Sequence, residues 1–174
     1  MAIWQFRLDV APIETIRERA HGVLPQAITD DMADDSFWLA MQPPQGLEKW
    51  IDAILPRASS WSEQMEMWGD EDGDCAAVGY KDEKKNSVED ISFRIDVRNI
   101  SDRFVRGVCA LARACDCVFI TAKKQVLQPD EPIVQEAIRN SLAKRYLEDP
   151  VKALLSLEPS ETIPILPPKE KDSS

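Results

Sequence analysis

Two segments of this chain alternate apolar and polar residues with a period of two, the spacing of a β-strand with one buried face. Their apolar members are Trp4, Phe6, Leu8 and Val10 in residues 3–10, and Ile91, Phe93, Ile95 and Val97 in residues 88–98. The links at residues 69–74 and 81–86 are short and polar, which favours antiparallel neighbours. The chain is therefore expected to build on an antiparallel sheet.

Other segments fit helices and shorter strands around this sheet. Apolar residues recur at helical spacing over residues 47–55, 101–115 and 131–147. Ser101 is a suitable N-cap for the second of these helices. Short strands are expected over residues 60–68, 75–80 and 116–121. The sequence thus predicts an α+β fold, with a mostly antiparallel sheet of about five strands and helices packed on one face.

A chain of 174 residues is long enough for one domain with a buried core. Residues 1–157 are predicted to form that domain, and residues 158–174, rich in Pro, Ser and charges, a disordered tail. We find no signal-peptide pattern and no apolar run near the roughly 20 residues that span a bilayer. These patterns predict a cytoplasmic protein.

The net charge of −10 is concentrated in the first half of the chain. Residues 1–80 hold 15 acidic and 5 basic side chains, whereas residues 87–174 hold 14 and 13. A negative field repels nucleic acid and anionic membranes and attracts a basic protein. The sequence therefore predicts a basic protein partner, no nucleic acid and no membrane. It leaves the oligomeric state open, including a homodimer.

Two groups of charged residues are candidates for binding this partner. The first lies in acidic loops and comprises Asp30, Asp31, Asp34, Asp35, Asp70, Asp72 and Asp74. The second is Arg94, Asp96 and Arg98, which on a strand share one face about 7 Å apart in succession. Arginine is favoured at interfaces. The alternatives are a solvated hairpin turn for residues 70–74 and a solvated charge ladder for residues 94–98.

The residue types give little support to a catalytic or metal site. His21 is the only histidine, which excludes a catalytic zinc site of the usual kind and favours a helix-end role. Buried thiols are expected at Cys75, Cys109, Cys115 and Cys117, although the spacing of the last three leaves metal binding or redox chemistry open. Residues 70–74 do not match a calcium loop. The chain is predicted to have no cofactor and not to be an enzyme.

Several short motifs are spread over most of residues 1–157: Trp4-x-Phe6, Trp68-Gly69, Arg94-Ile95-Asp96-Val97-Arg98, Ser141-x-Ala143-x-Arg145-Tyr146 and Asp149-Pro150. In these motifs the chain resembles a group of small bacterial proteins that are similar to immunity proteins of toxin–immunity systems. The resemblance implies a protein that binds and neutralises a cognate toxin, with no catalytic residues. Two alternatives stay open: a small enzyme using a carboxylate or cysteine in a cleft, and a self-associating structural subunit.

Overall fold

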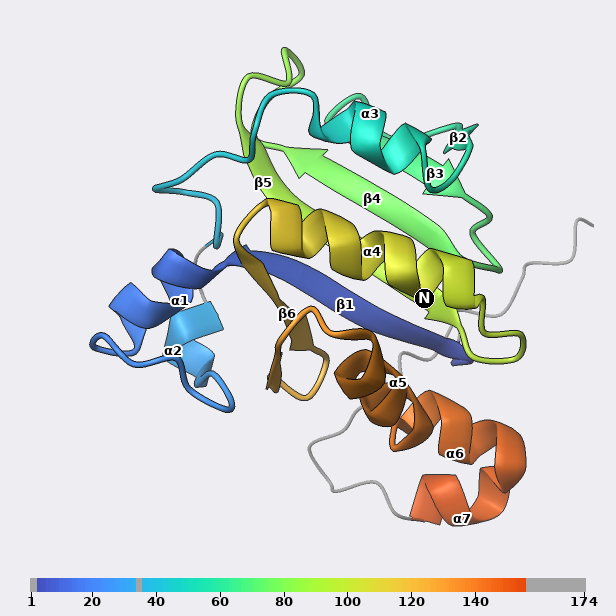
Figure 1. The fold of residues 1–174 in the computed structure, drawn as a ribbon. Coiled ribbons are helices and arrows are strands. Elements are labelled where there is room, and N and C mark those ends of the chain that lie inside the picture. Colours follow the sequence, from blue (N-terminus) through green and yellow to red (C-terminus); the bar gives the residue numbers. More distant parts are fainter. Residues whose placement is uncertain (1–2, 34–35, 156–174) are drawn as a thin grey trace, which may run out of the picture.

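The computed structural model describes residues 3–33 and 36–155. In these residues seven strands form one antiparallel sheet in the order β2-β3-β4-β5-β1-β6-β7 (Figure 1). Their bounds are β1 Gln5–Pro12, β2 Arg57–Ala58, β3 Met65–Gly69, β4 Cys75–Tyr80, β5 Val88–Asp96, β6 Cys117–Thr121 and β7 Val126–Leu127. The predicted α+β fold is confirmed. The prediction of about five strands is wrong, because the two edge strands have two residues each, too few to leave an alternation pattern.

The helices are α1 Ile13–Arg19, α2 Asp30–Ala33, α3 Leu47–Asp52, α4 Asp102–Ala114, α5 Glu131–Arg139, α6 Leu142–Glu148 and α7 Pro150–Leu155. Ser101 caps α4 as predicted, since its Oγ accepts a hydrogen bond from the backbone N–H of Phe104 at 3.2 Å. The helix predicted over residues 131–147 is instead two helices. Ser141 separates them, because its Oγ caps the first turn of α6 through the N–H of Lys144 at 3.1 Å.

The N-terminal strand lies inside the sheet because later parts of the chain pair with both its sides. β5 and β6 each run antiparallel to β1, so they are parallel to each other. The connection between them passes through α4, which lies across the sheet (Figure 1). The buried stripe of α4 packs on this face, where the rings of Phe93 and Phe104 meet edge to face with centroids 6.3 Å apart.

Side chains of the sheet alternate between two unlike faces. Phe6, Leu8 and Val10 face α3 and α4 and belong to the main core. On the opposite face, α1 and the segment leading to α2 cover a smaller cluster formed by Ala11, Ile16, Ile28, Val118 and Ile120. The prediction of helices on one face is therefore corrected at this end of the sheet. The rest of the opposite face carries polar side chains of β1 and β5, and we call it the open face: Gln5, Arg7, Asp9, Asp90, Ser92, Arg94 and Asp96.

The tail predicted for residues 158–174 lies outside the described residues. Within residues 3–33 and 36–155, the longest helix, α4, has 13 residues. No helix in these ranges combines the length and the apolar character that a membrane span requires.

Candidate functional site

The predicted turn at residues 70–74, which we call the acidic hairpin, connects β3 to β4. The chain enters it at Gly69 with a φ of 81°, and a side chain there would collide with the carbonyl of Asp74. The N–H of Asp70 donates to that carbonyl at 3.1 Å. The N–H of Asp72 donates to Oδ1 of Asp70 at 3.0 Å. The predicted turn is thus confirmed, and it has a defined internal hydrogen-bond pattern.

Side chains from outside the acidic hairpin hold it through its backbone carbonyls. Trp4 Nε1 donates to the carbonyl of Asp72 at 3.1 Å, and Arg98 Nη2 donates to the same oxygen at 2.6 Å. Gln5 Nε2 donates to the carbonyls on either side of Asp72, at 2.8 and 2.9 Å. These contacts are made to the backbone of the loop and order it. The guanidinium charge of Arg98 also attracts the carboxylates of Asp72 and Asp70.

The carboxylates of the hairpin fall into two kinds. Asp70, Glu71 and Asp72 are exposed, and none of them forms an ion pair within the described ranges. Asp74 is half-buried, and its Oδ1 accepts a hydrogen bond from the N–H of Asp96 at 2.8 Å. Burial raises the pKa of Asp74, while this hydrogen bond opposes the rise. The three exposed carboxylates are therefore available to a partner.

The second predicted group does not form a continuous ladder, because β5 ends at Asp96. Arg98 lies beyond the strand, with its guanidinium over the ring of Trp4 at 4.6 Å from the centroid. It also binds Asp96 with two nitrogens, at 2.9 Å from Nε and 2.8 Å from Nη2, and holds the pKa of Asp96 below its usual range. The structure thus brings together these predicted residues at one end of the sheet: Asp70, Asp72, Asp74, Asp96 and Arg98.

Arg94 lies apart from Arg98, half-buried on the open face. It is opposite Arg7 on β1 and Cys75 on β4. Directly opposed like charges repel, and Arg7 is neutralised by Asp9 at 2.7 Å. Arg94 forms no hydrogen bond or ion pair within residues 3–33 and 36–155. Its side chain is therefore charged and uncompensated by direct contact.

The remaining predicted acids do not join the hairpin. Asp30 and Asp31 begin α2, which lies at the opposite side of the molecule (Figure 1). Asp30 forms an ion pair with Lys124 in the β6–β7 turn, and a hydrogen bond from Thr29 lowers the pKa of Asp31. Asp34 and Asp35 lie outside the described residues. The acidic loops that the sequence grouped together thus belong to at least two surfaces.

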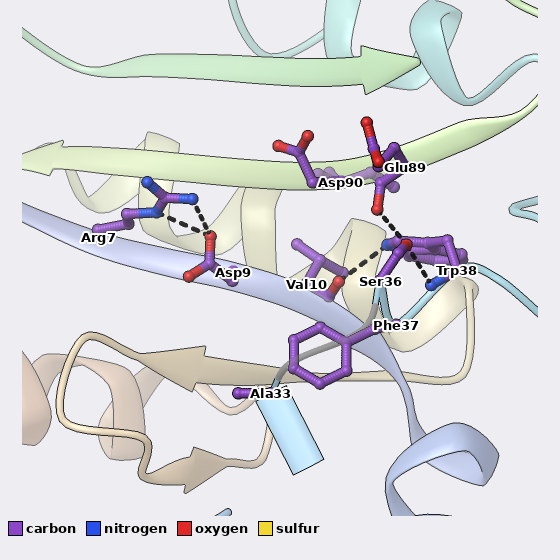
Figure 2. A pocket seen from close by; sticks show the side chains of 10 residues that line it. Arg7, Asp9, Val10, Ala33, Ser36, Phe37, Trp38, Glu89 and Asp90 are labelled. Carbon is purple, nitrogen blue, oxygen red and sulfur yellow. Dashed lines mark hydrogen bonds and ion pairs between the residues drawn. The ribbon is translucent and has the colours of Figure 1, made fainter. Parts of the chain in front are cut away.

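A hollow of about 270 Å³ opens between β1, β5 and the segment before α3 (Figure 2). One wall is fixed to the sheet: Ser36 Oγ donates to the carbonyl of Glu89, and Trp38 Nε1 donates to that of Val10 at 3.0 Å. The carboxylates that line the hollow are Asp9, Glu89 and Asp90. The hollow thus places three carboxylates around a concave surface.

Asp90 is a carboxylate in this hollow whose pKa is shifted. Its side chain leans from β5 toward β4, where Gly79 leaves room for the carboxylate; a Cβ at Gly79 would collide with Oδ1. Asp90 is exposed as a residue, but the atoms around its carboxylate remove part of its hydration. This desolvation raises the pKa of Asp90, with Asp9 and Glu89 adding to the rise and Arg7 opposing it. Asp90 is therefore easier to protonate than an ordinary aspartate.

The cysteines are free thiols, as predicted, and all but the half-buried Cys115 are buried. Burial raises the pKa of Cys75 and Cys115, that of Cys109 to about 11 and that of Cys117 to about 12. Thiols of this kind stay protonated and react slowly as nucleophiles. His21 is exposed at the end of α1. In the described part of the chain no three His, Cys, Asp or Glu residues are placed to hold a metal ion.

Two exposed tryptophans were missed by the sequence patterns. The strand predicted over residues 60–68 begins only at Met65, and Trp61 lies on the preceding turn with 77% of its surface exposed. Trp50 on α3 is 41% exposed, whereas Trp38 and Trp68 are buried. The available signal was the pair of serines around Trp61, since Ser favours turns over strands.

No family model, curated protein or solved structure matches the chain. The resemblance to immunity proteins therefore rests on the short sequence motifs.

Proposed function

We propose that this chain is a protein-binding domain, without catalytic chemistry of its own, that captures a basic protein through the acidic hairpin. The observation that carries the proposal is the way the hairpin is held. Trp4, Gln5 and Arg98 bind its backbone carbonyls, and the exposed carboxylates form no ion pair within the described residues, so cations of a partner can reach them. A loop that is ordered before binding loses little conformational freedom on association. Its negative field also speeds the encounter with a basic surface.

Neutralisation of a basic toxin in the cytoplasm is the form of binding that the sequence motifs favour. Toxins that attack nucleic acids need basic surfaces to hold phosphate groups. A protein with a net charge of −10 is complementary to such surfaces. An inhibitor of this kind has to cover the active surface of the toxin, and this needs well-placed charges and anchors but no reactive group.

The hollow favours a second candidate, a small enzyme that uses Asp90 as a proton donor. A raised pKa in a concave site is typical of general acids. Against it, the volume of about 270 Å³ lies below the roughly 300–1,000 Å³ of most small-molecule sites. The bond from Arg7 also keeps Asp9 occupied as an ion-pair partner. We therefore prefer binding over catalysis.

Self-association through a sheet edge, the third alternative, has little geometric support. Long, flat edge strands promote pairing between copies, and short ones discourage it. In the described residues the sheet ends on both sides in two-residue strands, β2 and β7. A partner that pairs by adding a strand would find few free backbone groups there.

A phage-displayed library of genomic fragments from the source organism tests the proposal, because it also presents proteins that the cell does not express. We expect the wild-type chain to select a basic protein whose binding weakens at high salt. The triple variant Asp70→Asn/Glu71→Gln/Asp72→Asn is expected to lose it, since the three exposed carboxylates are removed while the backbone contacts of the hairpin remain.

A second triple variant, Glu18→Gln/Glu83→Gln/Asp116→Asn, removes the same charge from exposed positions elsewhere and serves as the matched control. It should retain the selected protein. Selection of no ligand, or equal retention by both triple variants, would count against the proposed function. Turnover of a small substrate that disappears in Asp90→Asn would support the enzyme instead.

A further inference from the structure

Trp61 is the most exposed tryptophan among the described residues, and the turn that carries it is fixed by hydrogen bonds. Ser60 Oγ donates to the carbonyl of Ser62 at 2.8 Å and accepts from its N–H at 3.2 Å. Ser62 Oγ accepts from the N–H of Gln64 at 3.2 Å. A large apolar ring is thus held in water by an ordered backbone, at a cost in exposed apolar surface that a partner would remove.

The elements around this turn form one connected unit. Asp52 at the end of α3 accepts hydrogen bonds from Arg57 Nε on β2 at 2.8 Å and from Trp68 Nε1 on β3 at 2.7 Å. Arg57 also forms an ion pair with Glu66 at 3.2 Å. These contacts join α3, which carries Trp50, to the two strands that flank the Trp61 turn.

The same unit is strongly acidic. Residues 47–74, which we call the acidic edge, contain α3, β2, β3 and the acidic hairpin, and hold eight acidic and two basic side chains. β3 has five residues, so about 14 Å separates its two ends, one near the Trp61 turn and the other at the hairpin. A standard interface covers about 800 Å² on each partner, which is broad enough to include both.

We infer that the acidic edge is one continuous docking surface for the basic protein partner, with Trp61 and Trp50 as its aromatic anchors. The inference rests on the proposed function for the nature of the partner and adds the residues that anchor it. Binding energy at interfaces is concentrated in a few residues, most often Trp, Tyr and Arg, surrounded by a polar rim. A second copy of this chain is disfavoured as the occupant, because two acidic edges repel each other.

The test is calorimetric titration of the full chain with the protein selected from the genomic library. Trp61→Ala is expected to weaken binding about thirtyfold, the effect of losing an interface anchor. Trp50→Ala should weaken it less, since more of that ring is already buried, and Trp61→Phe should restore most of the affinity. Val23→Ala is the matched control, because Val23 is 72% exposed and follows α1, an element on the opposite side of the molecule from α3, β2 and β3 (Figure 1).

Thermal unfolding of Trp61→Ala should match that of the wild-type chain, since the ring makes few contacts that support the fold. If Trp61→Ala binds as the wild type does while the hairpin triple variant does not, the inference is wrong and the proposed function stands. If no ligand is selected, or if Trp61→Ala and the hairpin triple variant both bind as the wild type does, the inference and the proposed function are both wrong. A wild-type dimer in sedimentation that dissociates in Trp61→Ala would also overturn the inference, in favour of self-association.

Discussion

At the scale of single residues, the positions of the carboxylates depend on two glycines. Gly69 turns the chain into the acidic hairpin with a φ of 81°, and its missing side chain leaves space for the backbone carbonyl of Asp74. Gly79 leaves space for the carboxylate of Asp90. The two glycines differ in what they accommodate, since a carbonyl of the main chain cannot move aside and the end of an aspartate side chain can.

This difference predicts unequal costs for two substitutions by alanine. Gly69→Ala should lower the free energy of unfolding by about 3 kcal/mol, through a backbone clash and an unfavourable positive φ. Gly79→Ala should cost about 1 kcal/mol, because Asp90 can rotate. Urea denaturation measures both. Gly73→Ala is the control, since its Cβ would meet Asp70 at an ordinary 3.4 Å. Equal losses at Gly69 and Gly79 would contradict the account.

The ion pair of Asp96 with Arg98 predicts a pH-dependent contribution to stability. Arg98 lowers the pKa of Asp96 in the folded chain, so the ionised carboxylate stabilises the fold above its ordinary pKa of 3.8 and this contribution is lost as the pH falls through the folded value. Asp96→Asn should therefore reduce the free energy of unfolding by about 1 kcal/mol at pH 7, a modest figure because solvent screens the pair. In urea titrations, the difference in the free energy of unfolding between Asp96→Asn and the wild type should narrow toward pH 2.

The pKa of Asp90 is shifted in the opposite direction to that of Asp96, so its ionisation should have the opposite effect on stability. Its pKa is raised in the folded chain, so ionisation of Asp90 disfavours the fold once the pH rises above 3.8. Asp90→Asn should be at least as stable as the wild type at pH 7. The free energies of unfolding of the two proteins should converge at lower pH. A loss of stability at pH 7 as large as that of Asp96→Asn would contradict a raised pKa of Asp90 in the folded chain.

At the scale of elements, sequence patterns predicted the helices and strands whose apolar period extends over many residues and missed the short strands. The alternation around Phe93 and the apolar stripe of α4 extend over nine and 13 residues, so β5 and α4 were predictable. β2 and β7 are too short to show a period. Residues 60–68 were predicted as a strand from the loose alternation of Trp61, Met65 and Met67, although the serines around Trp61 favour a turn.

The N-cap of α4 allows a test at this scale. Ser101→Ala removes the acceptor for the N–H of Phe104 and should lower the free energy of unfolding by about 1 kcal/mol. Ser101→Asp should keep most of the stability, because aspartate also caps helices and its charge suits the helix N-terminus. Urea midpoints of the three proteins measure the effect. Equal losses in both variants would argue against capping as the cause.

At the scale of the whole molecule, the sequence predicted the charge but only part of its placement. The concentration of acids in residues 1–80 was visible from composition, and the turn at residues 70–74 from its Asp and Gly residues. Arg98 and Trp4 can both bind the carbonyl of Asp72 because β1 and β5 lie side by side. These two hydrogen bonds join residues that are 26 and 68 positions apart in the sequence. Such long-range pairing leaves no local pattern, and this is also why Asp30 and Asp31 could not be separated from the hairpin.

We propose that the exposed carboxylates of the acidic hairpin capture a basic protein. Stopped-flow association of the selected partner, measured over a range of salt concentrations, tests it most directly. We predict that Asp70→Asn/Glu71→Gln/Asp72→Asn associates at least tenfold more slowly than the wild type at low salt and shows a shallower salt dependence, because three steering charges are gone. An association rate and salt dependence equal to those of the wild type would contradict the claim.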